Sequence, residues 1–344
     1  MYLHSLATAV PEVSYSQETV WSIFTNSPAV DRLRPGSVEL VRKVLTGENG
    51  IDRRHFALHD IHQLLAADGE ALNRAFEEEA PRLGCRALEN SLEQAGWKAG
   101  EVDGLVVCTC TGYLCPGLSS FIAERAGLRA DTFLLDLVGQ GCGAAIPSLR
   151  SAAGMLAGNP TARVAVVAVE VCTAAFYLED EGGVLVSFCL FGDGAAASLW
   201  SGSPGPSGWR ASGFDSLHFP DKRQVLRFEN RHGRLRNRLH PSIPDASSTA
   251  VKALYDRSFA DTSAPPAIVS HGGGQKVLQA VEAKLGRPVA PGSHETLRKF
   301  GNMSSPSVLF ALEAELASAE LPEHLWMTSF GAGFTVHGMQ LRRG

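Results

Sequence analysis

The sequence predicts an α/β protein. Short apolar runs rich in β-branched residues alternate with longer helix-like stretches along all 344 residues, which is typical of folds in which helices cover sheets. Polar turns between these segments carry a cysteine, a histidine and an asparagine, and turns at strand ends are where α/β folds gather functional groups. A Pro/Gly/Ser-rich stretch at 201–208 divides the chain into candidate units of residues 1–200 and 209–344.

The first unit is expected to begin with a strand and to continue with strands and helices in alternation. The expected strands are Tyr2–Val10, Gly104–Cys110, Thr132–Leu137 and Arg163–Val171. The expected helices are Glu70–Ala95, Gly117–Ala126 and Gly143–Leu156. In the first of these helices Leu83, Leu88 and Leu92 recur at helical spacing, with charged residues elsewhere.

The second unit repeats this alternation. Its expected strands are Pro265–Ser270 and His324–Phe330, and its expected helices are Ser247–Tyr255, Gln275–Leu285 and Met303–Ala317. A short internal repeat accompanies the pattern, because Phe-Gly-x-Gly occurs at 191–194 and again at 330–333, each time before a strand-like run.

Composition excludes several classes of function. Lys and Arg number 31 against 36 Asp and Glu, so no overall basic charge indicates a nucleic-acid partner. No segment has the pattern of a signal peptide or the length of a membrane span, so no membrane insertion is expected. Seven cysteines, without the spacing of a disulfide scaffold, indicate free thiols in a reducing, cytoplasmic location.

Cys142 is the most informative residue. It lies where an apolar run ends in glycines and a helix-like stretch begins. A thiol at a helix N-terminus has unpaired backbone N–H groups and the positive end of the helix dipole beside it, which favours a nucleophilic thiolate. A buried apolar cysteine is the alternative interpretation of this segment.

Two further residues strengthen the nucleophile hypothesis. His271 follows a β-branched run and precedes three glycines, and Asn302 precedes a helical stretch. Singly, His271 fits an ordinary loop histidine and Asn302 fits a helix N-cap. Together with Cys142 they supply a nucleophile, an acid or base, and an amide donor.

Two rival chemistries are less consistent with the sequence. The order Cys, His, Asn also occurs in papain-like proteases, but the sequence around a papain-type nucleophile is absent and Cys142 lies too deep in the chain. Cys108, Cys110 and Cys115 are clustered, yet no Cys-x-x-Cys pair or histidine set completes a zinc site. No metal is therefore expected.

Five segments in order resemble the chalcone-synthase-like type III polyketide synthases, and the resemblance runs from about Val38 to Arg342. The segments are Cys108–Gly117, Leu190–Ala197, His271–Gly274, Gly301–Ser305 and Ser329–Gly333. The resemblance implies a thiolase fold, in which two related halves form five αβαβα layers. It places the nucleophile in the first half (1–200), and the histidine and asparagine in the second (209–344).

The same resemblance implies an acyltransferase. An acyl-CoA starter would load onto Cys142, and malonyl-CoA would decarboxylate to an enolate held by His271 and Asn302. Protonated His271 and the helix N-terminus would keep the sulfur as thiolate, and backbone N–H groups of Cys142 and the 330–333 turn would hold the acyl oxygen. The product would leave as a cyclised pyrone or resorcinol, and the acyl-CoA substrates would need no separate cofactor.

The family pattern also implies residues of the substrate pocket. Phe191 corresponds to one of two gatekeeper phenylalanines, whereas Asn237 stands at the other, which predicts a more polar cavity mouth and an aliphatic starter. Cys110, Cys115 and Cys172 stand where the family has pocket-lining residues, and the Cys115 position reaches into a partner's cavity, which implies a homodimer. The other implied substrate-binding residues are Ser304, Phe330, Gly331 and Gly333.

The coenzyme A-binding positions of the family are matched less well than the catalytic positions. The family's phosphate-binding basic residues are replaced here, so Arg42 and Lys43 are the nearest substitutes, with Gly273 and Gly274 as further contacts. Six arginines between 223 and 238 either meet coenzyme A or a carrier protein's phosphopantetheine arm, or form a solvated hairpin, which the charge pattern favours.

Two alternative functions remain open on sequence grounds. One is a stand-alone ketosynthase that joins chains bound to an acyl carrier protein, which the altered coenzyme A contacts favour. The other is a non-catalytic partner of a second synthase, which the presence of Cys142, His271 and Asn302 argues against.

Overall fold

Two sets of strands and helices, one from each half of the chain, build the molecule. The computed structural model describes residues 1–260 and 266–344. The strands are β1 (Tyr2–Ala9), β2 (Ser14–Ser16), β3 (Arg53–His55), β4 (Gly104–Cys108), β5 (Phe133–Leu137), β6 (Arg163–Glu170), β7 (Gly194–Ser201), β8 (Trp209–His218), β9 (Leu226–Arg231), β10 (Arg234–Leu239), β11 (Ala267–Ser270), β12 (His324–Gly331) and β13 (Thr335–Arg343). The helices are α1 (Gln17–Thr25), α2 (Pro35–Thr46), α3 (Ile61–Ala66), α4 (Gly69–Ala95), α5 (Leu118–Ala126), α6 (Ala145–Gly158), α7 (Gly182–Leu190), α8 (Ile243–Phe259), α9 (Gln275–Leu285), α10 (Pro291–Phe300) and α11 (Ser307–Leu316).

The nine main strands follow the order β11-β12-β13-β8-β1-β7-β6-β4-β5. Within this series the same arrangement occurs twice. In the first half β4 is parallel to β6, while β7 is antiparallel to both β6 and β1. In the second half β11 is parallel to β12, while β13 is antiparallel to both β12 and β8. The strands β1, β4, β6 and β7 therefore correspond to β8, β11, β12 and β13.

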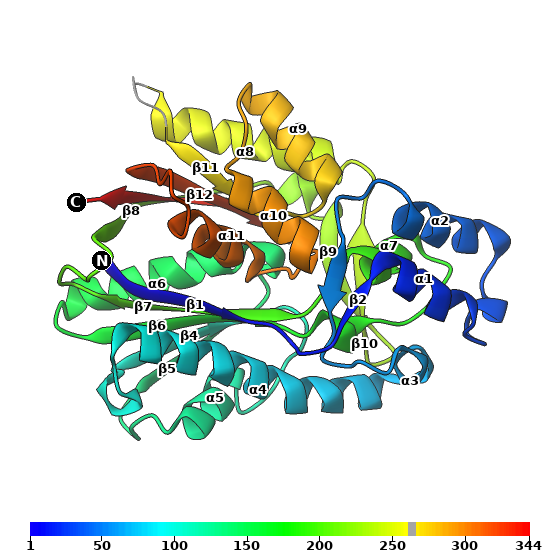
Figure 1. The fold of residues 1–344 in the computed structure, drawn as a ribbon, viewed down its shortest axis with the longest axis horizontal. Helices are drawn as coiled ribbons and strands as arrows, with labels where there is room; N and C mark the ends of the chain where they lie inside the picture. The colour runs from blue at the N-terminus through cyan, green and yellow to red at the C-terminus, as the bar shows by residue number, and fades with distance from the viewer. Residues whose placement is uncertain (261–265) are drawn as a thin grey trace.

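The two strand sets form separate layers, joined where β1 pairs with β8 at Tyr2 and Arg210. Figure 1 shows α8 and α9 over the outer face of the second set, and α4 and α5 over the outer face of the first. Helices α6 and α11 lie between the two sets. The result is the αβαβα layering of the thiolase fold.

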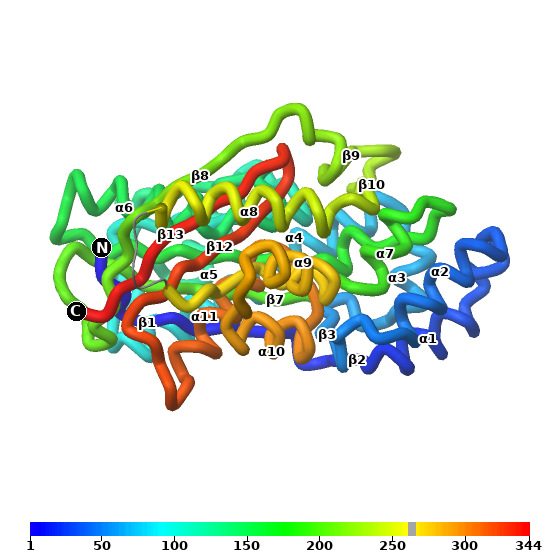
Figure 2. The backbone as a smooth tube through the Cα atoms, turned by 90° about the horizontal axis from the view of Figure 1, so that it is seen from above, coloured from blue at the N-terminus to red at the C-terminus, as the bar shows by residue number. Residues whose placement is uncertain are grey.

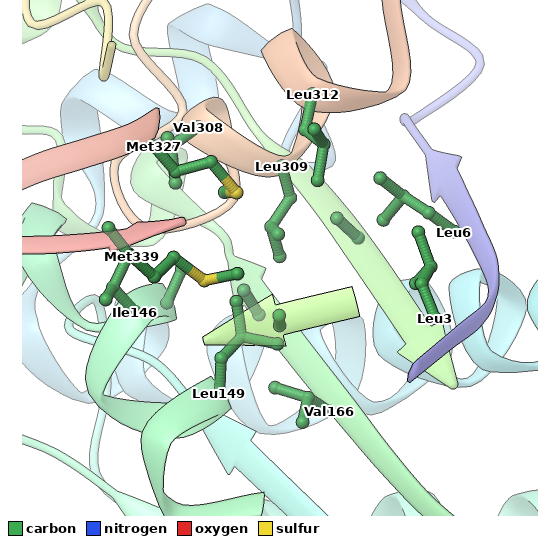
Figure 3. Packing of buried hydrophobic residues seen from close by; sticks show 14 of the residues in the cluster. Leu3, Leu6, Ile146, Leu149, Val166, Val308, Leu309, Leu312, Met327 and Met339 are labelled. Atoms are coloured by element: carbon green, nitrogen blue, oxygen red, sulfur yellow. The ribbon is translucent and has the colours of Figure 1, made fainter. Parts of the chain in front are cut away.

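The central layer is an apolar core. Ile146 and Leu149 of α6 and Leu309 of α11 are almost completely buried between strands of both sets (Figure 3). On β4, Val106 faces this core whereas Leu105 faces α4, as the two-residue repeat of a strand requires. Both faces of the strand are thus covered, which explains its uninterrupted apolar sequence.

One end of the layered core carries an additional cap. Helices α1, α2, α3 and α7 and the β9–β10 hairpin lie at the end remote from both termini (Figures 1 and 2). The cap has its own buried cluster, which includes Phe24, Phe56 and Phe188 and also contains Cys142. The cap therefore covers the cysteine that the sequence singles out.

Most expected elements occur close to their predicted bounds, and four of them differ at one or both ends. The helix expected at Met303–Ala317 begins at Ser307, because Ser304 has a positive φ of 60° and Pro306 follows it. The helix expected from Gly143 begins at Ala145, after a 3-10 turn at Gly141–Gly143. The helix expected from Ser247 starts earlier, at Ile243, with proline in its first turn. The strand expected to reach Cys110 ends at Cys108, and the predicted first residue of β11, Pro265, lies outside the described residues.

Among the described helices, none combines the length and the apolar character needed to cross a membrane. Nor do the described residues include a group of three or more His, Cys, Asp or Glu side chains arranged to hold a metal ion.

The central layer should dominate the stability of the fold. Leu149→Ala would leave a cavity at a fully buried position between the two strand sets, so we expect it to lower the free energy of unfolding by about 2–5 kcal/mol. Urea denaturation followed by circular dichroism measures this effect. Val13→Ala, at a side chain that is 36% exposed, is the control and should cost well under about 1 kcal/mol. Equal losses for the two variants would contradict a core in this layer.

Candidate active site

Cys142 lies in a tight turn between β5 and α6. The turn needs glycine on the N-terminal side of the cysteine, because Gly139 and Gly141 have φ values of 85° and 58°. Cys142 is 7% exposed and occupies the 3-10 turn that precedes α6. The thiol thus lies beside a helix N-terminus, as the sequence predicts. It belongs to the 3-10 turn that precedes α6 and not to α6 itself.

His271 follows β11 directly. Its backbone N–H donates to the carbonyl of Thr328 at 2.9 Å, and its ring meets the edge of Phe330 with centroids 5.2 Å apart. The side chain is 1% exposed, and neither Nδ1 nor Nε2 has a hydrogen-bond partner among the described residues. A buried ring with two free nitrogens is unusual and leaves both available to a ligand.

Asn302 lies on the segment between α10 and α11, where it contacts the first half of the chain. Its backbone N–H donates to Leu190 O at 2.9 Å, and its carbonyl accepts from Gly192 N at 3.0 Å. Its side-chain Oδ1 accepts from Ser304 N at 2.8 Å, and its Nδ2 donates to Gly273 O at 3.2 Å. Among the described residues, one of the two Nδ2 hydrogens therefore has no partner.

Ser304 connects these residues. Its hydroxyl donates to Cys142 Sγ at 3.2 Å and lies 3.0 Å from Cys110 Sγ. A continuous series of contacts thus runs from Cys142 through Ser304, Asn302 and Gly273 to His271, since Gly273 N also donates to His271 O at 3.1 Å. Residues from opposite halves of the chain are brought together around one thiol.

The end of β12 and the turn that follows it pack against the segment that contains Cys142. A Cβ atom at Gly331 would overlap the carbonyl oxygen of Gln140 and come within 2.7 Å of Gly143 N, so only glycine fits there. Phe330 is buried against His271, while Gly333 lies farther out, at a surface cleft. The predicted contribution of this turn is therefore geometrically possible.

Burial opposes the charged forms that the sequence analysis assigned to the two catalytic groups. It raises the pKa of the Cys142 thiol to about 12 and lowers the pKa of His271 to about 4. A shift of three units from 9 corresponds to about 4 kcal/mol, whereas a helix dipole supplies at most about 2 kcal/mol. Burial thus favours the neutral thiol and the neutral imidazole over the isolated charged forms.

The predicted pocket residues lie at different places around this centre. Phe191 is buried in the same cluster as Cys142 and Cys172. Asn237, on β10, is 5% exposed; its Nδ2 donates to Ser187 Oγ at 2.9 Å, and its Oδ1 has no partner among the described residues. Cys115 differs from the other two pocket cysteines, because it is exposed at the surface of the chain.

The predicted coenzyme A contacts are not assembled into one basic site. Arg42 donates from Nε and an η nitrogen to Glu39, both at 2.7 Å, and Lys43 lies 3.9 Å from the same carboxylate. Both cations are thus paired on the exposed face of α2. Gly274 caps α9, and the Gly273 carbonyl accepts from the Asn302 amide.

The arginine-rich segment forms the hairpin that the charge pattern favours. Strands β9 and β10 pair antiparallel, from Leu226 with Leu239 to Arg231 with Arg234. It is less solvated than expected, because Arg236 is buried and paired with Glu181 and Glu179. Through these ion pairs the hairpin is joined to the segment that precedes α7 within the cap.

A cleft of about 870 Å³ opens beside the catalytic group. Cys110, Gly141 and Gly333 line its inner part, and α4 and the β9–β10 hairpin line its outer part. Arg74, Arg223 and Arg227 are among its outer residues. The cleft offers space for an extended ligand next to the Ser304–Cys142 contact.

Glu170, which no sequence motif singled out, organises the inner wall of this cleft. Its carboxylate accepts hydrogen bonds from Thr109 Oγ1, Cys110 N, Thr111 N, Thr111 Oγ1 and Ser305 Oγ. Burial raises its pKa. A lone acidic residue within an apolar strand sequence was the available signal.

Comparisons with known proteins agree with this arrangement. Residues 5–210 match the model of the FAE1/type III polyketide synthase-like protein family, and residues 261–343 match the C-terminal model of 3-oxoacyl-[acyl-carrier-protein] synthase III. The 3,5-dihydroxyphenylacetyl-CoA synthase of Amycolatopsis orientalis is 32% identical over 90% of this chain and 84% of its own. The 1,3,6,8-tetrahydroxynaphthalene synthase of Streptomyces peucetius subsp. caesius is 28% identical over 97% and 91%.

Solved structures share the fold. The C-terminal type III polyketide synthase domain of Steely1 from Dictyostelium superposes with a TM-score of 0.89, 24% identity and 99% coverage of both chains. The 1,3,6,8-tetrahydroxynaphthalene synthase of Streptomyces coelicolor A3(2) gives 0.86 at 23% identity, over 100% of this chain and 99% of that one. CsyB, solved in complex with CoA-SH, gives 0.87 at 22%, over 100% of both chains.

The burial of Cys142 leads to a prediction about its reactivity. If His271 takes up the thiol proton, the thiolate and imidazolium together carry no net charge, which reduces the penalty of burial. His271→Ala should therefore slow alkylation of Cys142 by iodoacetamide at pH 7 at least tenfold, with a rate that still rises above pH 9 because burial raises the thiol pKa to about 12. Peptide mass spectrometry measures the rate, with exposed Cys115 as the internal control. An unchanged rate would show that the helix turn alone activates the sulfur.

Proposed function

The chain belongs to the type III polyketide synthase family, and on that premise we propose that it condenses malonyl-CoA with an acyl group carried on Cys142. One observation carries the proposal: among the described residues both His271 ring nitrogens are buried without a partner, and Asn302 is joined through Ser304 to the Cys142 thiol and through Gly273 to the His271 backbone. These groups are free to donate hydrogen bonds to the oxygen of an enolate formed next to a thioester.

Acyl loading is the first step. The Cys142 thiol gives its proton to His271 and attacks the carbonyl of an acyl-CoA. The tetrahedral oxyanion accepts hydrogen bonds from backbone N–H groups of the Cys142 turn and of the neighbouring Gly331 turn. Coenzyme A leaves as a thiolate and takes up the proton from His271, so the acyl-enzyme and the imidazole both end neutral.

Decarboxylation supplies the carbon nucleophile. Malonyl-CoA loses carbon dioxide, and the electron pair of the broken C–C bond moves to the thioester oxygen as an enolate. His271 and Asn302 donate to that oxygen, and their free N–H groups require no existing hydrogen bond to break. The enolate carbon then attacks the carbonyl of the Cys142 thioester, the C–S bond breaks, and Cys142 leaves as a thiolate. The chain, now two carbons longer, is carried on coenzyme A, and the thiolate is ready to be acylated again.

The cleft beside Cys110 fits the extended product. Its volume of about 870 Å³ accommodates repeated extension and a folded chain that cyclises to a pyrone or resorcinol. An aliphatic starter is our proposal, because Asn237 stands where an aromatic gatekeeper would narrow the mouth. Coenzyme A thioesters serve as substrates, no further cofactor takes part, and the protein acts in the cytoplasm.

A homodimer completes the proposal. Strand β5 ends the strand series, and Phe133 and Val138 near it are 55% and 48% exposed. An edge strand with exposed apolar residues favours pairing with another chain. Exposed Cys115 lies after Tyr113, which is itself 76% exposed, on a loop that would meet the partner there.

The alternative functions receive less support. A ketosynthase dependent on a carrier protein finds a match in the C-terminal family model, but the similar full-length relatives are polyketide synthases. A non-catalytic partner would not need the assembled contacts around Cys142. Neither alternative is therefore preferred.

A product assay tests the function as a whole. Incubation with malonyl-CoA and a series of acetyl, aromatic and C6–C16 acyl-CoA starters should give pyrones or resorcinols that depend on the starter, with mass spectrometry as the readout. Cys142→Ala should abolish every product, because no thioester forms. Acyl loading on Cys142 without any product would instead indicate that free malonyl-CoA is the wrong extender substrate.

The two half-reactions can be separated at Asn302. Asn302→Ala removes one enolate donor, so malonyl-CoA decarboxylation should slow by about 10²–10³-fold, or about 2.7–4 kcal/mol. Loading of a starter acyl group on Cys142 should change much less, because that step does not use the enolate site. Carbon dioxide release measures one half-reaction and intact-protein mass the other. Equal loss in both would contradict the assignment of Asn302 to the enolate.

A further inference from the structure

Arg54 is a completely buried arginine where the two halves of the chain meet. It is 0% exposed and lies on β3, underneath the segment that follows α7. One η nitrogen donates to both Phe188 O and Phe191 O at 2.7 Å, and Nε donates to Gln17 Oε1 at 2.9 Å. Its acceptors are therefore backbone and amide oxygens, with two of them in one short segment.

That segment holds Asn302 in place. Phe191 and Asn302 form a parallel β-bridge, framed by the hydrogen bonds from Asn302 N to Leu190 O and from Gly192 N to Asn302 O. Arg54 also packs against the other side of the bridge, since a Cβ at Gly301 would lie 2.8 Å from the arginine Cγ. The arginine thus contacts both segments that fix the Asn302 backbone.

The charge of Arg54 is not explained by ion pairing. Among the described residues no carboxylate lies within salt-bridge distance, and the second η nitrogen has no hydrogen-bond partner. Burial lowers its pKa to about 10, so it stays charged at neutral pH. Nearby Asp193 favours the charged form without a direct ion pair, and a rigid, forked donor is well suited to fix several carbonyls at once.

We propose that Arg54 is a positioning residue that sets the location of the Asn302 amide for the decarboxylation half-reaction. The inference rests on the proposed function, and it adds a residue that touches neither substrate nor Cys142. It acts through the carbonyls of Phe188 and Phe191, which fix the bridge to Asn302. A displacement of Asn302 of about 1 Å would weaken the enolate contact and leave acyl loading intact.

The test compares Arg54→Met with the wild-type enzyme in the two separate half-reactions. We expect kcat for malonyl-CoA decarboxylation to fall by roughly 10–100-fold, while loading of a starter acyl group on Cys142 stays within about threefold. Arg53→Met is the matched control, because Arg53 is the exposed neighbour on the same strand, and both rates should be unchanged. Circular dichroism confirms that each variant is folded.

A double-mutant cycle tests the route through Asn302. If Arg54 works by positioning that amide, the Arg54→Met/Asn302→Ala double variant should decarboxylate no more slowly than Asn302→Ala alone. A double variant whose loss of decarboxylation rate equals the product of the two single losses would overturn the proposal. Equal slowing of loading and decarboxylation in Arg54→Met would overturn it as well. A purely structural role of the arginine would produce either of these results.

Arg54→Lys is a second variant, which tests the proposal if Arg54→Met does not fold. Lysine keeps the charge and most of the volume, but a single ammonium cannot reproduce the fork to both carbonyls and to Gln17. The same selective loss of decarboxylation is expected, and wild-type decarboxylation by Arg54→Lys would overturn the proposal. A wild-type enzyme that loads no acyl group and decarboxylates no malonyl-CoA would instead contradict the proposed function, and this inference with it.

Discussion

Two backbone hydrogen bonds hold the active site together. Asn302 donates to Leu190 and accepts from Gly192, so the segment before α11 is fixed to the segment after α7. These segments lie more than a hundred residues apart and belong to different halves of the chain. Through this bridge Cys142 of the first half joins the hydrogen-bonded series that contains Asn302 and the His271 backbone of the second half. The site therefore exists only when the halves are packed together, and the apolar central layer is what packs them.

The duplicated topology explains why the right groups meet. Helices α6 and α11 precede equivalent strands, β6 and β12, and the turns before them carry Cys142 and Asn302 respectively. Strands β4 and β11 are also equivalent, and Cys110 and His271 follow them. Because carboxyl ends of parallel strands meet at one edge of a sheet, each half delivers its groups to the same place. One architecture thus supplies different chemistry from each half by changing residues at equivalent turns.

The sequence predicts this fold well because its signals are local. Gln275–Leu285 is helical at its predicted bounds, and the repeated Phe-Gly-x-Gly turns precede the equivalent strands β7 and β13. Arg54 escaped prediction, because its role depends on three oxygens contributed by distant segments. The pairing of Arg42 with Glu39 depends on side-chain geometry that alternative pairings could equally satisfy. Periodicity and motifs thus identify elements and catalytic turns, while the supporting contacts need the assembled structure.

Burial has opposite consequences for the two half-reactions. It penalises an isolated thiolate at Cys142 and an isolated imidazolium at His271, so the proposed loading step is favoured when one proton passes from the thiol to the imidazole. For decarboxylation the same burial is an advantage, because a neutral imidazole and an amide donate strongly to an enolate where water does not compete. Loss of carbon dioxide also generates the carbanion without a strong base, which a buried site could hardly keep ionised. A deeply buried Cys-His-Asn group is therefore better suited to decarboxylative condensation than to hydrolysis, which needs water at the thioester.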